Sequence, residues 1–380
     1  MRAYKFRIYP SKKQETEMHG HLWISKNLWN KLLEANKKKY EEEKKFIPKS
    51  EMQRMVKECG LYSQTAQVLS HRLYNSIKMK VKAKNEGKKT GFPRFKSFER
   101  MKSLHYPQFG FSLENKLKIT PFGEIAIKKH REITGRIKTL TLKRESSGKW
   151  FAIFTVEQGK QQPKINGGEA VGIDLGLKNF VTFSNGKIIQ NPRHLKRWED
   201  KLVFIQRELS KKKKGGSNRK KAKVRVAKLH EKIADCRRDF LHKISTELVN
   251  DYSIIALEKL ASKEMSEENY GKQIRDAGWN MFANMLAYKA EGAGCKVVFV
   301  DPRNTTKECS SCGALVDKTL RDRAHNCPFC GLSIDRDLNA ARVILIRATE
   351  GHSGSNACNS LQKERDAAIA TSVKQEALIL

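Results

Sequence analysis

The chain has 380 residues, of which 39% are hydrophobic and 31% are charged. This composition is typical of a folded protein of two to three domains. There are 76 Lys and Arg against 41 Asp and Glu, and 76 − 41 gives a formal net charge of +35. Such an excess argues against a small-molecule enzyme and favours nucleic acid as the partner, because each neutralised phosphate releases a counterion. A basic ribosomal or histone-like protein without catalysis is the alternative at this point.

The ends and the apolar runs of the chain give no sign of a membrane. No run approaches the ~18 apolar residues that a membrane span needs. The first ten residues (MRAYKFRIYP) alternate basic and apolar side chains and lack the apolar core of a signal peptide. We therefore expect no membrane partner, a cytoplasmic and nucleoid-associated location, and reduced thiols.

The first predicted elements are a strand and a long helix. Residues 1–10 predict a strand that places Tyr4, Phe6 and Ile8 on one face. Ser11 and Gln14 have the spacing of a capping box, which predicts a helix start. An apolar stripe at roughly helical period then follows, formed by Leu22, Trp29, Leu33 and Tyr40.

A second helix is predicted near Ser63, where apolar residues recur at spacings of three and four. Residues 83–104 are predicted to form a loop, and its stretch Gly91–Lys96 (GFPRFK) interleaves aromatic and basic side chains, as nucleic-acid contacts do. From His105 to Glu157 the period changes to two between glycine-containing turns. This pattern predicts a small β-barrel or sandwich.

The second half of the chain alternates strands and helices. Residues 159–169 look like a linker, and Asn185-Gly186 predicts a hairpin after a strand that ends at Asp174. Two amphipathic helices are expected next, joined by a basic loop from Lys211 to Lys223. The later elements are predicted at Ile254–Glu258 (strand), Trp279–Glu291 (helix) and Val297–Val300 (strand).

Four of the eight cysteines have the spacing of metal ligands. Cys309 and Cys312 form one C-x-x-C pair, Cys327 and Cys330 form another, and 14 residues separate the pairs. A glycine follows each pair and allows the tight turn of a zinc knuckle. The sequence therefore predicts a structural Zn²⁺ site with all four positions filled. His325 lies nearby, and we interpret it as a bystander.

Three carboxylates form the predicted catalytic set. Asp174 and Glu258 each end an apolar strand, where a charge is costly unless it is paired or bound to metal. Asp337 lies where a loop passes into a helix after the second cysteine pair. Three converging carboxylates can hold two Mg²⁺ ions about 4 Å apart for phosphodiester hydrolysis. Any one of them alone is more often a cap or a salt-bridge partner.

With these motifs in order, the chain resembles TnpB, the transposon-encoded RNA-guided nucleases related to the type V CRISPR effectors. The resemblance runs from the first strand to about residue 348. The motifs that carry it are Gly172–Gly176, Leu257–Leu260, Cys309–Gly313, Cys327–Gly331, Asp335–Ala341 and, in the first half, Gly91–Lys96.

The resemblance implies an α+β multidomain fold with a RuvC (RNase H-like) α/β nuclease domain interrupted by a zinc ribbon. The implied parts are a wedge β-barrel (1–10 and 89–158), a helical recognition insert (11–88), a linker (159–169), the nuclease (170–304 and 333–349) and the ribbon (305–332). Residues 350–380 match nothing in the family and form a C-terminal tail of unknown role.

The resemblance also implies the chemistry and the partners. Asp174, Glu258 and Asp337 would be the catalytic Mg²⁺ ligands, with Asp335 as the competitor of Asp337. Guide RNA would come from the transposon end. Target double-stranded DNA, with its displaced single strand, would be cut beside a short flanking motif, and we expect a monomer.

Two other functions stay open at this stage. An unguided RuvC-like resolvase needs the same carboxylates, but no helical insert, barrel or ribbon. A non-catalytic transposition accessory factor or guided repressor is expected to lose a carboxylate, whereas all three are present here.

Overall fold

A computed structural model describes residues 1–159, 166–260, 270–319 and 322–349. The chain divides into two compact units, residues 1–160 and 161–380, which are described separately below. Within the described residues, none of the helices is long and apolar enough to cross a membrane.

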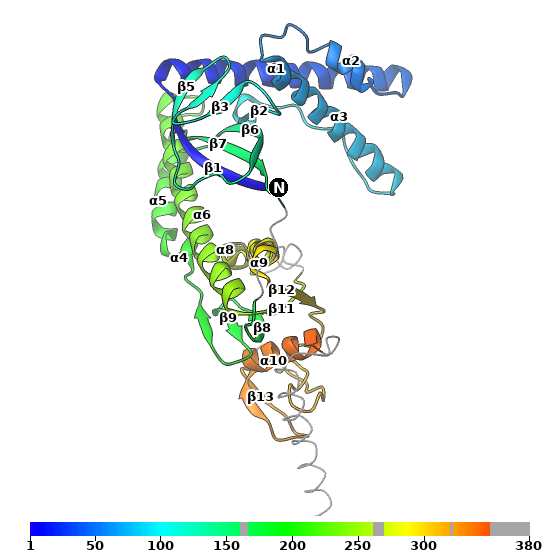
Figure 1. Cartoon of the computed structure of the whole chain (residues 1–380), viewed down its shortest axis with the longest axis vertical. Helices are drawn as coiled ribbons and strands as arrows, with labels where there is room; N and C mark the ends of the chain where they lie inside the picture. The colour runs from blue at the N-terminus through cyan, green and yellow to red at the C-terminus, as the bar shows by residue number, and fades with distance from the viewer. Residues whose placement is uncertain (160–165, 261–269, 320–321, 350–380) are drawn as a thin grey trace, which may run out of the picture. The chain divides into compact units, whose positions relative to one another are not determined.

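Unit 1 contains a curled, near-barrel antiparallel sheet (Figure 1). Its seven strands have the spatial order β2-β6-β7-β1-β5-β4-β3. The N-terminal strand β1 pairs with β5 on one side and with β7 on the other, so that it ties the two halves of the sheet together. The strands are β1 (Arg2–Tyr9), β2 (Ser103–Tyr106), β3 (Phe111–Leu113), β4 (Leu117–Ile119), β5 (Gly123–Lys128), β6 (Arg136–Arg144) and β7 (Trp150–Glu157).

Alternation of side chains along these strands builds the core of unit 1. The predicted inward face of β1 is confirmed, since Tyr4, Phe6 and Ile8 are at most 2% exposed. Phe6 packs beside Phe154 of β7, which is also fully buried. The period of two from residue 105 to 157 predicted a small β-barrel or sandwich, and the near-barrel sheet agrees with that prediction, although the order of its strands was not predicted.

The helices of unit 1 are α1 (Lys12–Glu43), α2 (Lys49–Arg54), α3 (Ser63–Asn85) and a single 3₁₀ turn η1 (Phe98–Arg100). The predicted capping box of α1 is present, because the side chains of Ser11 and Gln14 each accept from the other's backbone N–H. The apolar stripe of α3 is buried as predicted. The short helix α2 was not predicted, since six residues carry too little periodicity to be recognised.

The stretch Gly91–Lys96 lies against α1. The side-chain amide of Asn30 pairs with both backbone groups of Lys96, and the Trp29 indole donates to the Arg94 carbonyl. The Lys96 ammonium lies 3.6 Å from the centroid of the Trp29 ring, and burial lowers its pKa to about 8. Lys80 of α3 lies 3.5 Å from the centroid of Phe92. These aromatic and basic side chains therefore contact one another, and their contact with nucleic acid stays a prediction.

Unit 2 is built on a five-stranded mixed sheet with the order β10-β9-β8-β11-β12. Strands β10, β9 and β8 are antiparallel neighbours, whereas β8, β11 and β12 run parallel. The hairpin at Asn185-Gly186 is confirmed. The strands are β8 (Ala170–Leu175), β9 (Asn179–Phe183), β10 (Ile188–Gln190), β11 (Ile254–Glu258) and β12 (Lys296–Val300).

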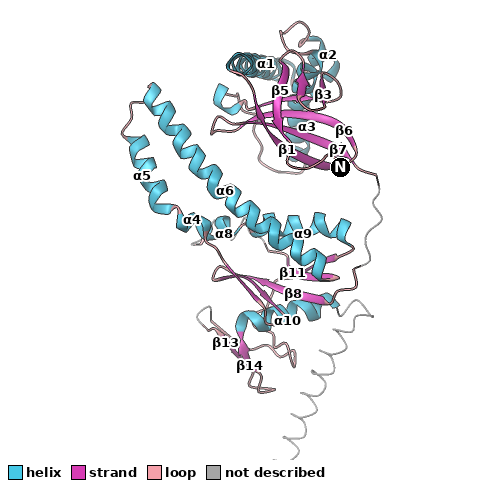
Figure 2. Ribbon diagram, turned by 60° about the vertical axis from the view of Figure 1, so that its left-hand side comes forward, coloured by secondary structure: helices cyan, strands magenta, loops and turns pink. Residues whose placement is uncertain are grey.

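Helices cover both faces of this sheet (Figure 2). On one face, Val171 and Ile173 of β8 and Ile255 and Leu257 of β11 form a core with the helices before and after β11. On the opposite face, Ala256 of β11 packs against α10 (Arg336–Thr349). Successive side chains of a strand point to opposite faces of the sheet, so neighbouring residues contact different helices.

Gly172 of β8 lies directly under α10. A Cβ atom at this position would come 2.1 Å from the Ala341 carbonyl oxygen and 2.8 Å from Leu345, both on α10. Because no other residue leaves this space empty, glycine sets the close approach between helix and strand.

The remaining helices of unit 2 are α4 (His194–Arg197), α5 (Glu199–Ser210), α6 (Ser217–Asp251), α8 (Gly271–Ala277) and α9 (Trp279–Ala293). Helices α5 and α6 form a long antiparallel pair (Figure 2). The predicted loop from Lys211 to Lys223 is wrong in its second half, since α6 begins at Ser217. Alternating Lys and Arg mask the helical period there, because basic side chains suit a solvated helix and a loop equally well.

A small hairpin precedes α10. Its strands are β13 (Ala324–Asn326) and β14 (Ser333–Asp335), and they pair in antiparallel register on either side of the second cysteine pair. Strand β14 lies just beyond the expected end of the ribbon at residue 332. Helix α10 starts at the next residue, Arg336.

Candidate metal centres

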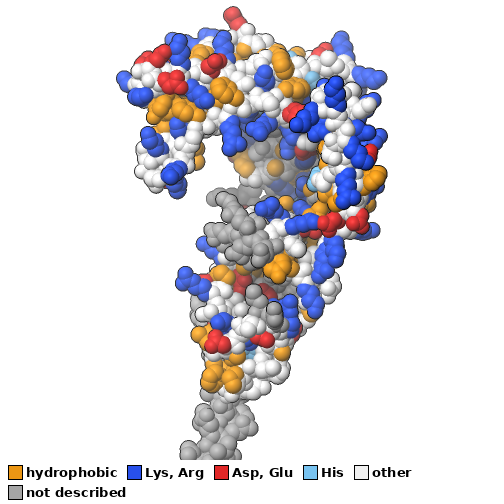
Figure 3. Space-filling view, turned by 180° about the vertical axis from the view of Figure 1, so that it is seen from behind, with side chains coloured by type: hydrophobic (Ala, Val, Ile, Leu, Met, Phe, Trp, Pro, Cys, Tyr) orange, Lys and Arg blue, Asp and Glu red, His pale blue; other side chains and the backbone are white. Residues whose placement is uncertain are grey.

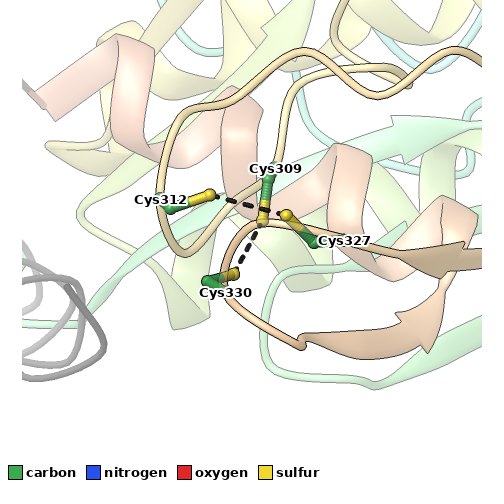
Figure 4. Close-up of side chains that lie close together, drawn as sticks. All are labelled: Cys309, Cys312, Cys327 and Cys330. Carbon is green, nitrogen blue, oxygen red and sulfur yellow. Dashed lines mark hydrogen bonds between the residues drawn. The ribbon is translucent and has the colours of Figure 1, made fainter. Parts of the chain in front are cut away.

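The four predicted cysteines come together at one point in unit 2. Figure 4 shows the sulfur atoms of the two knuckles facing one another. The sulfur–sulfur distance is 3.6 Å between Cys309 and Cys330 and 3.5 Å between Cys312 and Cys327. Among the described residues, this group is the one identified as able to hold a metal ion, with all its ligand atoms within 4.8 Å of one another.

The two knuckles repeat the same backbone pattern. In each, the N–H of the first cysteine donates to a carbonyl five residues on, from Cys309 to Ala314 and from Cys327 to Leu332. The glycine after each second cysteine, Gly313 or Gly331, has φ of +73° and donates back to the first cysteine. Each C-x-x-C-G stretch thus contains the glycine that its own tight turn requires.

The cysteine group fits a tetrahedral metal. A zinc ion with Zn–S bonds of about 2.3 Å places its sulfur ligands about 3.8 Å apart, close to the distances found here. Burial raises the pKa of Cys309. For Cys330, burial is outweighed by the Leu332 backbone and the neighbouring thiols, which lower its pKa to about 7.

His325 is outside this ligand group. Its side chain is fully buried, and one ring nitrogen bonds the Lys318 ammonium. It lies in β13, where it pairs with Ile334 of β14. The sequence-based interpretation of His325 as a bystander agrees with this position.

Two of the three predicted carboxylates lie at neighbouring strand ends. Leu257 of β11 pairs in parallel with Ile173 of β8, so Glu258 and Asp174 each follow one member of that pair. Asp174 follows Gly172 by two residues, and Glu258 follows Ala256 by two residues. Each carboxylate is therefore on the same strand face as a residue that contacts α10. The alternation of the two strands therefore directs both side chains toward the face that α10 covers.

The third carboxylate comes from α10 itself, and Asp335 has a different role from Asp337. The Asp335 side chain accepts the backbone N–H groups of Asp337 and Leu338, at 2.8 and 3.2 Å. It is therefore the N-cap of α10. Asp337 lies in the first turn, where its carboxylate is 3.4 Å from the Arg336 guanidinium.

The other two carboxylates influence the pKa of Asp174. The pKa of Asp174 is raised to about 8 by burial and by the nearby charges of Glu258 and Asp337, against the opposing effects of Arg336 and the Leu175 backbone. Burial also raises the pKa of Glu258, which the Thr305 hydroxyl and Arg347 partly oppose. Half-buried carboxylates whose charges act on Asp174 offer hard oxygen ligands to a cation, so the residues fit Mg²⁺. They are not a group as compact as the cysteines.

Sequence reasoning missed the residues that surround these ligands. The Thr305 hydroxyl bonds Glu258, and the Asn339 side chain bonds the backbone beside Cys309. Arg347 joins α10 to Glu308. The signal that could have found Asn339 is a short polar residue on the apolar face of a predicted helix.

Comparison with known proteins identifies the family. A "Putative RNA-guided DNA endonuclease" of Streptomyces pristinaespiralis is 31% identical over 391 aligned positions, which cover 99% of this chain and 96% of the relative. The chain belongs to the TnpB family. A second relative is "Putative RNA-guided DNA endonuclease InsQ" of Escherichia coli K12, which is 29% identical to this TnpB family chain. The alignment covers 91% of this chain and 92% of the relative.

Three family descriptions match parts of this TnpB family chain. Residues 153–269 match a probable transposase, residues 279–344 match the Cas12f1-like TNB domain, and residues 1–45 match a helix-turn-helix domain. The last description does not fit the local structure, since residues 1–45 form strand β1 and the single long helix α1.

One solved structure supports the fold of this TnpB family member. It is the cryo-EM structure of a Cas12f1-sgRNA-target DNA complex, which aligns over 88% of this chain and 83% of that chain. The TM-score is 0.58 at 16% sequence identity, so the likeness concerns the fold alone.

Proposed function

We propose that this chain is the RNA-guided DNA endonuclease of a transposon and that Asp174, Glu258 and Asp337 form its reaction centre. The observation that carries the proposal is that Asp174 and Glu258 lie at neighbouring strand ends on the face covered by α10, whose first turn holds Asp337. Burial, together with the charges of Glu258 and Asp337, raises the pKa of Asp174 to about 8. Groups whose pKa is shifted by burial and by specific charged neighbours are common at reaction centres.

The surrounding fold supports a RuvC (RNase H-like) assignment for unit 2. Its mixed sheet carries helices on both faces, and the carboxylates sit at the carboxyl ends of the parallel strands β8 and β11. Ligands commonly bind at this edge of such sheets.

Two kinds of metal follow from the two donor sets. Cys309, Cys312, Cys327 and Cys330 would hold a structural Zn²⁺, with no position left open. Asp174, Glu258 and Asp337 would hold two Mg²⁺ ions, which supply activation of water and stabilisation of the leaving oxygen when bound.

The nucleic-acid partners follow from the charge and the family. The net charge of +35 suits simultaneous contact with RNA and DNA. Lys and Arg side chains are spread over the visible surfaces of both units (Figure 3). The guide RNA would come from the transposon end. Target DNA would be opened beside a short flanking motif, with residues 1–10 and 89–158 as the wedge and 11–88 as the recognition insert.

The first test is RNA capture followed by programmed cleavage. The protein is expressed with its native downstream DNA, and RNA that purifies with it is sequenced. We expect one discrete structured RNA that ends in variable sequence. A plasmid bearing the matching target should then be cut in Mg²⁺. Asp174→Asn and Glu258→Gln should lower the rate on the order of a thousandfold, because the metal supplies several kcal/mol.

The control for charge is Glu291→Gln, which removes an exposed carboxylate from α9. It should cut like the unmodified protein, and all variants should keep their RNA. Heterogeneous RNA with guide-independent cleavage would instead indicate the resolvase. A discrete RNA without any cleavage would indicate the guided repressor, and cutting by both active-site variants would contradict the assigned residues.

A further inference from the structure

Residues 305–310 connect the cysteine site to the carboxylate site, and we refer to them as the lead-in segment. They run from the end of the loop after β12 into the first knuckle at Cys309. Two of their contacts reach elements that carry predicted catalytic carboxylates. Neither contact is part of the cysteine site or of the carboxylate site as proposed above.

The first contact is made by Thr305. This residue is only 2% exposed, and its hydroxyl donates to Oε1 of Glu258. The Pro302 carbonyl lies 3.2 Å from the same hydroxyl. Because a hydroxyl has one hydrogen to donate, and a carboxylate is the stronger acceptor, the Glu258 contact dominates. Thr305 thereby restricts the rotation of the Glu258 carboxylate.

The second contact is made by Asn339 of α10. Its amide is fully buried and spans the backbone on both sides of Cys309. Oδ1 accepts the Ser310 N–H at 2.9 Å, and Nδ2 donates to the Glu308 carbonyl at 2.7 Å. An amide side chain carries a donor and an acceptor side by side, which matches these two backbone groups. Asn339 lies two residues after Asp337, so the start of α10 is fixed to the first knuckle.

The far end of α10 is fixed to the same segment. Arg347 forms an ion pair with Glu308 at 2.5 Å and also donates to the backbone carbonyls of Asp301 and Arg303 at 2.9 Å. Helix α10 therefore contacts the lead-in segment and the loop before it at two levels. Its rotation, which would move Asp337, is opposed at both.

We propose that the lead-in segment positions two of the three carboxylates, Glu258 through Thr305 and Asp337 through Asn339. Thr305 and Asn339 are positioning residues in this scheme, because they act through the ligands and not on the substrate. The inference rests on the proposed function, since it assigns a supporting shell to that same carboxylate site. Residues that orient metal ligands typically change metal affinity by 10- to 100-fold when they are replaced.

The test measures metal binding directly, apart from cleavage. Mn²⁺ is titrated into the zinc-loaded full-length protein and followed by electron paramagnetic resonance. Thr305→Val should weaken Mn²⁺ binding about tenfold, whereas Thr305→Ser, which keeps the hydroxyl, should restore it. In guided cleavage, Thr305→Val should raise the half-saturating Mg²⁺ concentration more than it lowers the maximal rate.

The matched control is Thr349→Val. Thr349 is also buried and lies on α10, and among the described residues its hydroxyl bonds the Leu345 and Ile346 carbonyls of its own helix. Thr349→Val makes the same chemical change as Thr305→Val, but at a hydroxyl that has no carboxylate partner among the described residues. Mn²⁺ binding of this variant should therefore match that of the unmodified protein. Asn339→Leu is a second test, expected to weaken Mn²⁺ binding while zinc remains stoichiometric.

Three results would overturn the inference. If Glu258→Gln loses Mn²⁺ but Thr305→Val binds it normally, the positioning role is wrong and the proposed function stands. If Thr305→Val and Thr349→Val weaken binding equally, the effect is one of packing. If Glu258→Gln and Asp174→Asn bind Mn²⁺ like the unmodified protein, the metal site itself is wrong and both proposals fail.

Discussion

The cysteine site and the carboxylate site of unit 2 are encoded in opposite ways. All four cysteines lie within residues 309–330, and each knuckle repeats a turn that its own glycine makes possible. The carboxylates Asp174, Glu258 and Asp337 come from three separate elements, β8, β11 and α10. The first site is local, whereas the second exists only when the sheet and its covering helix have assembled.

This difference separates what each site depends on. The cysteine site needs its ligands and a metal. The carboxylate site needs strand register, the close approach at Gly172 and the N-terminal turn of α10. Substitutions that spare every ligand should therefore harm the carboxylate site and leave the cysteine site intact, whereas loss of a cysteine should harm both.

The largest effect is expected from Cys309→Ser. Binding of a structural zinc contributes about 10–16 kcal/mol in small zinc domains, and that energy is folding energy. We expect loss of bound zinc, greater protease sensitivity around residues 305–335, and loss of cleavage, measured by metal analysis, limited proteolysis and plasmid cutting. Cys236→Ser removes a thiol from α6 and should change none of these. Full zinc content in Cys309→Ser would contradict the site.

An intermediate effect is expected from Gly172→Ala. The added methyl group would overlap the Ala341 carbonyl, so α10 must move and the unfolding free energy should fall by about 1–3 kcal/mol or more. Denaturant unfolding measures this loss, and cleavage should fall with it while zinc stays bound. Gly167→Ala, where no described atom lies within 4 Å of the added methyl group, is the control. Equal stability of the two variants would show that α10 does not approach β8 so closely.

The smallest effect on stability is expected for the two aspartates at the start of α10, whose roles cleavage separates. Asp335→Asn keeps an N-cap acceptor and should cleave normally, whereas Asp335→Ala should lose about 1 kcal/mol of stability. Asp337→Asn should abolish cleavage with little change in melting temperature. Loss of cleavage in Asp335→Asn, with Asp337→Asn active, would reverse the two roles.

Much of the fold could be predicted where one pattern is sufficient. The alternation in β1, the capping box at Ser11 and the Asn185-Gly186 turn are local rules, and the structure follows them. The extent of α6 and the presence of α2 and α8 were missed, because lysine-rich or very short segments carry little helical period. The order of strands in either sheet is set by tertiary packing, which no local pattern records.

The two candidate sites also differ in how far local sequence patterns could predict them. The cysteine ligands could be recognised from spacing alone, and the structure brings them together. The carboxylates could be selected from strand ends and from the family resemblance, but their roles remain proposals. Thr305 could not be predicted, because its partner, Glu258, lies far away in sequence. Asn339 could have been noticed as a polar residue on an apolar helix face, but its partner, the backbone beside Cys309, could not have been.

The junction between the small hairpin and α10 has a mechanical consequence. Strand β14 ends at Asp335 and α10 begins at Arg336, so no residue lies between them to serve as a hinge. Asp335 belongs to the strand and caps the helix at once. The hairpin and the helix are therefore joined directly, and any displacement of the hairpin would be passed on to the first turn of α10, which carries Asp337.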